Sequence, residues 1–372
     1  MNTRLDSIDV ARGLAALSVA VYHHGFGHVL AEATGWRGFE LMVWPGAQLA
    51  VPLFFVISGF CIHLGWLSRK PATHFTRGFF IQRFFRIYPP WLLAIAVSSS
   101  VLWLNGRTPD TRQVLRYLTL TNGFFDDYRL NAALWSVSVE SLLYLLYPFW
   151  LAVRRGHGLR FAALLALGVS AASGAVTAQF FEQPTGPSMW FFLNVWCGWV
   201  AGAVLAELCH EHQGRVLHHA VWWIGGVAAV SLHVLLKYRE AYSGPWAFAY
   251  LPVTIILCVW PLSLLIVAGE TIATGRPPLL ITQCWRLLKH IGVFSYSLYL
   301  LHVPLQSLRL FFNAHLTGSL AKGLLFIGWF GFVLGVSWLC HRWVEEPSAR
   351  LGRRIVERLR SAQKNSLVPH AA

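Results

Sequence analysis

The chain has 372 residues, of which 56% are hydrophobic and 12% are charged, and its formal net charge is +14. Soluble domains carry about a quarter charged residues, so this composition excludes an ordinary soluble protein and indicates one embedded in a lipid bilayer. The positive excess does not indicate a nucleic-acid partner. Lys and Arg gather in loops on one side of the expected spans, as the positive-inside rule requires.

Apolar runs of about 20 residues recur along the chain and predict an all-α fold, a polytopic transmembrane bundle of about ten helices. The first run carries an Arg and two His and is not followed by a cleavage site, so we expect it to stay in the membrane. The distribution of Lys and Arg predicts that both termini are cytoplasmic. The expected spans are residues 8–29, 47–67, 87–104, 132–153, 160–180, 189–208, 220–236, 246–268, 289–312 and 323–343.

The first span, "VARGLAALSVAVYHHG", carries ionisable residues near both ends. Arg12 and His23 are 11 positions apart, which on an α-helix returns to within roughly 20° of the same face. Asp9 lies three residues before Arg12 and is expected to pair with it. Ionisable groups at this depth usually face the bundle interior; the alternative is an interfacial Arg with a packing His. His24 points about 100° away and is a weaker candidate.

A neutral histidine is the natural general base near pH 7. His23 is therefore a candidate to take the proton from a hydroxyl that attacks an activated acyl group. It is equally a candidate to carry the acyl group itself for a moment. The sequence leaves both roles open.

The stretch "RGFFIQRFFRIYPPWL" places Arg83 and Arg86 three positions apart, on one helix face before the third span. Guanidinium groups bind phosphates through paired, planar hydrogen bonds. Such a pair at the cytoplasmic membrane edge indicates a phosphate-bearing donor. Plain positive-inside anchoring, or contact with lipid headgroups, is the alternative.

In "LWSVSVESLLYLLYPFW" the residues Ser136, Glu140, Tyr144 and Tyr147 recur at helical spacing and form one polar stripe. Glu140 is the only carboxylate there, so it must be protonated, paired or hydrated. We expect it to be a partner for the histidine or a ligand for a sugar-like acceptor. The alternative is a structural ion pair with an Arg of another helix.

In "FSYSLYLLHVPL" the residues Ser295, Tyr299 and His302 again share one helical face. A binding role and simple interhelical hydrogen bonding both fit this pattern. The stretch "CHEHQGRVLHH" lacks the spacing of a zinc motif, so we predict no metal site. The six cysteines form no CxxC pair and are interpreted as packing residues.

Taken together and in this order, the motifs resemble the acyltransferase-3 family of multi-pass membrane acyltransferases. The resemblance runs from Leu5 to about Arg354, and the Arg with a His eleven residues later is the family's most characteristic signature. One departure is that Ser141 and Leu142 stand where the family often has a second Glu and a Gln. The matching segments are "LDSIDVARGLAALSVAVYHH", "VPLFFVISGF", "QRFFRIYPPWLL", "LWSVSVESLLYLLYP", "FSYSLYLLHVPL" and "WVEEP".

The resemblance implies an enzyme that moves an acyl group, most often acetyl from acetyl-CoA, to a hydroxyl of a surface or secreted glycan. It implies that His23 is catalytic, with Arg12 its partner and Glu140 in support. Arg83 and Arg86 would handle the CoA donor. Binding roles are expected for Asp9, Trp135, Ser136, Tyr144, Ser295, Tyr299 and His302.

Further expectations follow from the same resemblance. Acyl-CoA would be a substrate, with no permanently bound cofactor. The protein would lie in a bacterial cytoplasmic membrane. It would be the stand-alone form, with a transmembrane domain at 1–354 and a basic cytoplasmic tail at 355–372. The acceptor is open among O-antigen, exopolysaccharide, a lipo-oligosaccharide signal and a small glycosylated product, as are the acyl chain and the oligomeric state.

A different class of protein also fits the buried Arg, His and Glu. A transporter of a polar or acidic solute would carry such residues inside its spans. The lack of an obvious two-fold hydropathy repeat counts mildly against it. The other large class of membrane acyltransferases, built on a buried Asn/His pair, fits less well because the matched motifs belong to a different set.

Overall fold

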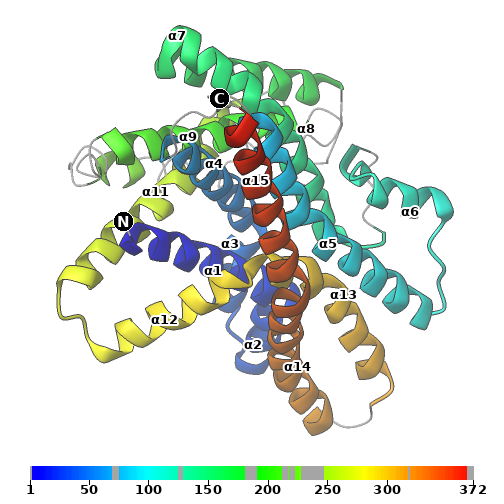
Figure 1. Ribbon diagram of the computed structural model, residues 1–372. Coiled ribbons are helices and arrows are strands. Elements are labelled where there is room, and N and C mark those ends of the chain that lie inside the picture. The colour runs from blue at the N-terminus through cyan, green and yellow to red at the C-terminus, as the bar shows by residue number, and fades with distance from the viewer. Residues whose placement is uncertain are drawn as a thin grey trace. The chain divides into compact units, whose positions relative to one another are not determined.

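The computed structural model describes residues 2–68, 75–124, 129–180, 191–211, 217, 223–227, 247–316 and 319–366. Within these ranges every regular element is a helix, as Figure 1 shows, so the predicted all-α fold is confirmed. The expected span 220–236 lies outside the described residues except for a short helical piece at 223–227. Most of the histidine-rich stretch Cys209–His219 also lies outside them.

The chain divides into two compact units, and each is described by itself. The first comprises Met1–Lys70 and Leu115–Ser295, and the second comprises Pro71–Val114 and Tyr296–Ala372. The helices of the first unit are α1 (Asn2–His24), α2 (Phe26–Thr34), α3 (Gly38–Gln48), α4 (Ala50–Leu67), α7 (Trp135–Phe180), α8 (Phe191–Asn194), α9 (Trp196–Glu211), α11 (Ala247–Thr274) and α12 (Leu279–Val293). Those of the second are α5 (Phe75–Leu104), α13 (Ser295–Ala314, whose first residue falls in the first unit), α14 (Ser319–Cys340) and α15 (Glu346–Ser366). The short α6 (Thr111–Leu118) crosses the division.

Five stretches of the described residues are long and apolar enough to cross a membrane: Ala50–Leu67, Thr76–Leu104, Ala132–Thr177, Phe192–Glu211 and Leu320–Ala362. Two expected spans, 132–153 and 160–180, both lie in the single long helix α7. The helix α1 is not among the five, and Arg4, Asp6, Asp9 and Arg12 all fall in its first half. The expected span at its position is therefore a helix whose first half is polar.

A sharp bend divides α7 at Gly158, which has φ 85° and ψ 167°. A positive φ costs little only for glycine, so this residue permits the bend. The indole Nε1–H of Trp150 donates to the carbonyl of Ala162 at 3.1 Å. On a straight helix these residues would be about 18 Å apart, so the chain turns back on itself here. The two expected spans are thus two arms of one bent element.

The core of the first unit is the pair α4 and α9, which cross at two glycines. A Cβ added at Gly59 would lie 1.9 Å from the carbonyl oxygen of Trp199, and one at Gly202 would lie 2.0 Å from that of Val56. Small residues let two membrane helices approach this closely, since packing rather than hydrophobicity drives their association in lipid. The helix α1 packs along α12 and also touches α4. This arrangement places α1 beside the crossing pair.

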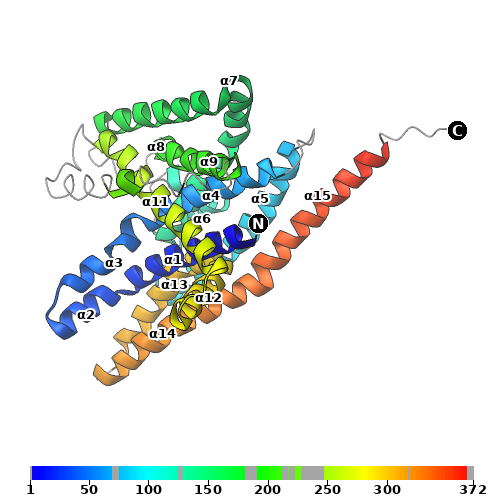
Figure 2. The same cartoon turned by 90° about the vertical axis from the view of Figure 1, so that its left-hand side faces the viewer.

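In the second unit α14 continues through a π-helical turn, His341–Glu345, into α15. Figure 2 shows the three as one rod, which α5 joins by packing against α15. Within the turn Glu345 is buried and accepts a hydrogen bond from Ser297 Oγ at 2.7 Å. The predicted domain boundary at 354/355 falls inside the continuous helix α15.

Candidate functional site

The first candidate group lies on α1, which carries Asp9, Arg12 and His23 on one unbroken helix as predicted. The side chain of Arg12 is 20% exposed, and its Nη1 donates to Asp9 Oδ1 at 3.4 Å. Its Nη2 donates to the sulfur of Cys61 on α4 at 3.3 Å. Arg12 therefore points from α1 into the helix bundle rather than away from it.

His23 lies at the other end of α1, and its side chain is exposed, whereas that of His24 is 3% exposed. The carbonyl of Val19 lies 3.0 Å from His23 Nδ1. A carbonyl can only accept, so Nδ1 carries the proton, and in the neutral ring Nε2 is the unprotonated nitrogen. We expect the side chains of Arg12 and His23 to point into the bundle. Arg12 does so, whereas the side chain of His23 is exposed.

Two residues of the polar stripe predicted on α7, Glu140 and Tyr144, take part in a directed series of hydrogen bonds. Tyr144 OH donates to Glu140 Oε1 at 2.5 Å. Because that proton is used, the contact of 3.3 Å between Ser58 Oγ and Tyr144 OH is donated by Ser58. Trp199 Nε1–H in turn donates to Ser58 Oγ at 3.3 Å. Each donor in this series points toward the Glu140 carboxylate.

Charge interactions link this series of hydrogen bonds to α1. The Arg12 guanidinium interacts electrostatically with Cys61 and Asp9 and, across to α7, with Tyr144 and Glu140. We call these five residues the Arg12 cluster. It joins the predicted residues Asp9, Arg12, Glu140 and Tyr144 in one place, with one fixed cation facing two carboxylates. Such a group can hold an anion or a developing negative charge in a site of low dielectric constant.

The other predicted residues of α7 have more local contacts. Ser136 is 3% exposed and donates to the carbonyl of Ala133 at 3.2 Å, which closes the turn before the helix. Trp135 is partly exposed at the start of α7.

The remaining predicted residues lie on α5 and α13. Arg83 is partly buried on α5 with its guanidinium over the ring of Phe79, 5.8 Å from the centroid, and Arg86 is partly buried one turn later. On α13 the side chains of Ser295, Tyr299 and His302 are all buried, and His302 Nδ1 donates to the carbonyl of Tyr299 at 2.7 Å. Except for Ser295, these residues belong to the second unit.

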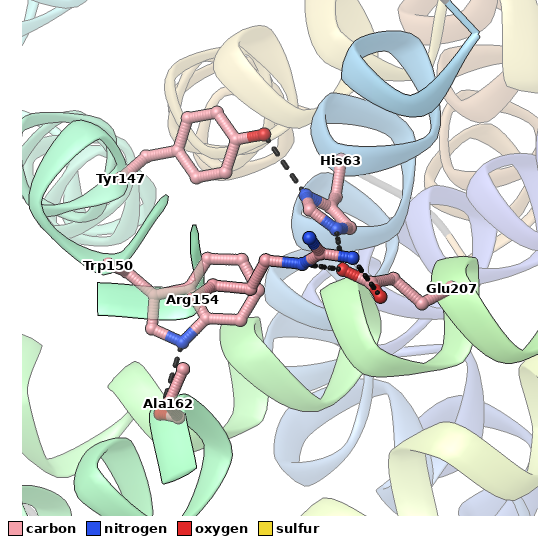
Figure 3. A network of polar contacts seen from close by, with 6 residues as sticks. All are labelled: His63, Tyr147, Trp150, Arg154, Ala162 and Glu207. Atoms are coloured by element: carbon pink, nitrogen blue, oxygen red, sulfur yellow. Dashed lines mark hydrogen bonds and ion pairs between the residues drawn. The ribbon is translucent and has the colours of Figure 1, made fainter. Parts of the chain in front are cut away.

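A second polar group was not predicted from the sequence. Figure 3 shows His63 of α4 between Tyr147 of α7 and Glu207 of α9, with Arg154 of α7 on the same carboxylate. His63 Nε2 lies 2.7 Å from Glu207 Oε1 and Nδ1 lies 3.1 Å from Tyr147 OH. Arg154 donates from Nε to Oε1 at 2.6 Å and from Nη2 to Oε2 at 2.7 Å. We call these four residues the Glu207 network.

One signal in the sequence points toward this network. Arg154 is 14 positions after Glu140, so it continues the polar stripe of Tyr144 and Tyr147 along α7. Its position in a charged loop between expected spans instead suggests a plain cytoplasmic charge. His63 and Glu207 are single ionisable residues in apolar runs, and such residues indicate a functional or structural role by default. Their pairing across 144 positions could not be read from the sequence.

Comparison with known proteins gives a consistent picture. Residues 5–342 match the acyltransferase-3 family, described as an acyltransferase domain. The acyltransferase MdmB of Streptomyces mycarofaciens is 26% identical over 94% of this chain and 93% of its own length. Nodulation protein 10 of Rhizobium leguminosarum bv. viciae is 25% identical over 62% of this chain and 70% of its own. No solved structure matches the chain.

Proposed function

The chain belongs to the acyltransferase-3 family and is a membrane acyltransferase, and from this premise we propose that it is an O-acyltransferase. The donor is acyl-CoA, most simply acetyl-CoA, and the acceptor is a hydroxyl of a surface or secreted glycan. The enzyme works in a bacterial cytoplasmic membrane with both termini in the cytoplasm. The acceptor glycan is an O-antigen, an exopolysaccharide or a lipo-oligosaccharide.

His23 is the proposed base. Its Nδ1 faces a carbonyl, which leaves the lone pair on Nε2, and its ring is exposed to an arriving substrate. As the acceptor oxygen attacks the thioester carbonyl, a C–O bond forms and Nε2 takes the hydroxyl proton. The C–S bond then breaks, and the proton passes to the leaving CoA sulfur. If His23 carries the acyl group instead, Nε2 attacks the thioester carbonyl, the C–S bond breaks and CoA leaves as the thiolate. The acceptor hydroxyl then attacks the acyl group, the bond to Nε2 breaks, and the hydroxyl proton passes to the CoA thiolate.

The observation that carries the proposal is the Arg12 cluster on the same helix as His23. Arg12 lies 11 residues before His23, about 16 Å along the helix axis, so the two side chains do not meet on one carbonyl group. Arg12 instead supplies a fixed positive charge for an anionic part of the substrate. Arg12 is held between Asp9 and Cys61 at 3.4 and 3.3 Å. The Glu140 carboxylate, oriented by Tyr144, sets the local charge balance around it.

The remaining predicted residues take binding roles in this proposal. Arg83 and Arg86 hold the phosphates of the CoA donor at the cytoplasmic edge, where paired guanidinium groups suit a phosphate. Trp135 and Ser136 of the first unit are proposed to contact the acceptor, because indole and hydroxyl groups suit a glycan. Ser295, Tyr299 and His302 on α13 are proposed to bind substrate through their hydroxyl and imidazole groups.

The test uses purified protein, labelled acetyl-CoA and glycan fractions as acceptors, with CoA release and label transfer measured together. We expect the His23→Ala variant to lose about 10²- to 10⁴-fold in the rate of transfer, which is the usual contribution of a positioned base. His28→Ala is the matched control, because His28 is an exposed histidine on the next helix, and it should leave the rate unchanged. Transfer by His23→Ala at the wild-type rate contradicts the assignment of His23. Wild-type protein that binds a solute but releases no CoA would indicate a transporter.

A further inference from the structure

The Glu207 network is more deeply buried than the Arg12 cluster. His63 and Tyr147 are 0% exposed, and Glu207 is 1% exposed. Arg154 is 26% exposed and reaches the carboxylate from the outer side. The ring of His63 also stacks on Trp66 at 5.1 Å and meets Trp150 edge-on at 5.2 Å. The network is thus enclosed by aromatic rings.

Its hydrogen bonds form a closed set. The carboxylate of Glu207 already accepts two bonds from Arg154, so His63 Nε2 donates to it and Nδ1 accepts from Tyr147 OH. Both nitrogens of a fully buried ring are therefore engaged. Such a histidine does not meet a substrate in this arrangement, and any role in the reaction must act through its neighbours.

A buried network whose hydrogen bonds are all made mainly fixes the relative positions of the helices that supply it. A buried ion pair is often no more stabilising than apolar residues of the same size, because desolvation offsets the attraction. Removing one partner is nevertheless costly, since it leaves an uncompensated charge. The network therefore selects one arrangement of the three helices that supply it, α4, α7 and α9.

The position of the network shows which arrangement it selects. It lies one turn beyond the crossing of α4 and α9 at Gly59 and Gly202. The same stretch of α4 carries Cys61, which contacts Arg12, and Ser58, which contacts Tyr144. On α7, Tyr147 follows Tyr144 by one turn. A shift of α4 against α7 at the network would therefore move both contacts of the Arg12 cluster.

We propose that His63, Glu207 and Arg154 are positioning residues that fix α4 against α7 and α9, and thereby hold Arg12 and Glu140 at the distance that acyl transfer needs. The expected effect on kcat rests on the proposed function. The expected effect on the position of α4 does not depend on that function. A misplacement of about 1 Å by a change far from the chemistry can cost about 10²-fold in rate.

The first experiment compares Glu207→Gln with Glu211→Gln in the full-length protein. The first variant keeps the shape of the side chain and removes the buried charge, while Glu211 is an exposed carboxylate one turn later on the same helix. We expect kcat for acyl transfer to fall about 10- to 100-fold in Glu207→Gln, with little change in the KM for acetyl-CoA. Glu211→Gln should match the wild type.

The second experiment measures the geometry without the reaction. Cys61 is half-buried against Arg12, so its rate of alkylation by a small thiol reagent, read by mass spectrometry of its peptide, reports the position of α4. We expect a several-fold change in this rate in Glu207→Gln and none in Glu211→Gln. If Glu207→Gln is not recovered folded, Arg154→Lys keeps the charge and removes the two-pronged contact, and it should change the same rate.

The outcomes separate the two proposals. A change in Cys61 alkylation in a protein that shows no acyl transfer supports the positioning role and contradicts the proposed function. A folded Glu207→Gln or Arg154→Lys variant with wild-type Cys61 alkylation overturns the positioning role. A lower melting temperature together with wild-type kcat would also overturn it, because that result describes a purely structural ion pair.

Discussion

The Arg12 cluster and the Glu207 network share two helices, α4 and α7, yet differ in how their charges are treated. In the Arg12 cluster the cation is partly exposed and faces two carboxylates through longer contacts, 3.4 Å to Asp9 and electrostatic interaction with Glu140. In the Glu207 network one carboxylate is buried and receives three short hydrogen bonds of 2.6 to 2.7 Å. The first arrangement leaves charge that can act on a substrate. In the second, the charge of the Glu207 carboxylate is balanced by Arg154 and its oxygens are hydrogen-bonded within the network.

The difference teaches how ionisable residues inside a membrane domain can be sorted. Both groups carry the cost of charge in a medium of low dielectric constant. A group whose donors and acceptors are all matched can only define a structure, whereas a group with charge left over can act on a ligand. This rule ranks the expected effects of substitutions in the two groups, and a different ranking would break it.

The largest effect is expected at Arg12. Replacing Arg12 by Gln removes the positive charge that interacts with the Asp9 and Glu140 carboxylates. We expect transfer to fall about 10²-fold, because a substrate that is misplaced by about 1 Å can lose this much in rate. The measurement is kcat for acetyl transfer, with the melting temperature in detergent as the control for folding. A variant with near-normal kcat would show that the Arg12 cluster is structural too.

The next effect concerns stability at the crossing of α4 and α9. Gly59→Ala adds a Cβ that meets the backbone of Trp199, so we expect a loss of about 1–3 kcal/mol in unfolding free energy. Gly65→Ala is the matched control on the same helix, because nothing lies within 4 Å of a Cβ added there. Thermal unfolding of the two variants in one detergent compares them. Equal stability would contradict the close crossing.

A smaller effect is expected when Tyr144 becomes Phe, which removes the hydroxyl that donates to Glu140. The Glu140 side chain loses the donor that orients it, and the Ser58 hydroxyl loses its acceptor. We expect kcat to fall about 10-fold, the size of one hydrogen bond to a charged group. Single-turnover transfer measures it directly. A change in the KM for the acceptor alone would instead assign Tyr144 to binding.

The smallest effect on the reaction is expected when Tyr147 becomes Phe, three residues further on the same helix. This change takes one hydrogen bond from His63 Nδ1 but leaves the contacts between His63, Glu207 and Arg154 in place. The buried acceptor left behind should cost about 1–3 kcal/mol of stability. Transfer should stay close to the wild-type rate. A larger loss of kcat for Tyr147→Phe than for Tyr144→Phe would reverse the roles of the two groups.

Local pattern was enough to predict much of this structure. Helical spacing alone placed Glu140 and Tyr144 on one face of α7 and Asp9 and Arg12 on one face of α1, because such contacts depend on three or four residues of regular helix. The hydropathy pattern likewise predicts the all-α fold. The expected spans 132–153 and 160–180 imply that the chain reverses between them, but the charged stretch that joins them does not specify that Gly158 makes the bend inside one helix.

Contacts between distant segments could not be predicted in the same way. The sequence indicates only a packing role for Cys61, and its contact with Arg12 depends on how α1 meets α4. His63 meets Glu207 only because Gly59 and Gly202 let α4 and α9 cross closely. The exposure of His23 and the burial of His24 also depend on neighbouring helices rather than on their own spacing.

The central claim is that the Arg12 cluster supports acyl transfer in this protein. The most direct test measures CoA release from acetyl-CoA by the purified protein with and without a glycan acceptor, for the wild type and for Glu140→Gln at equal melting temperature. We expect release by the wild type that rises with acceptor and falls at least about 10-fold in Glu140→Gln. Equal, acceptor-dependent release by both proteins would contradict the claim.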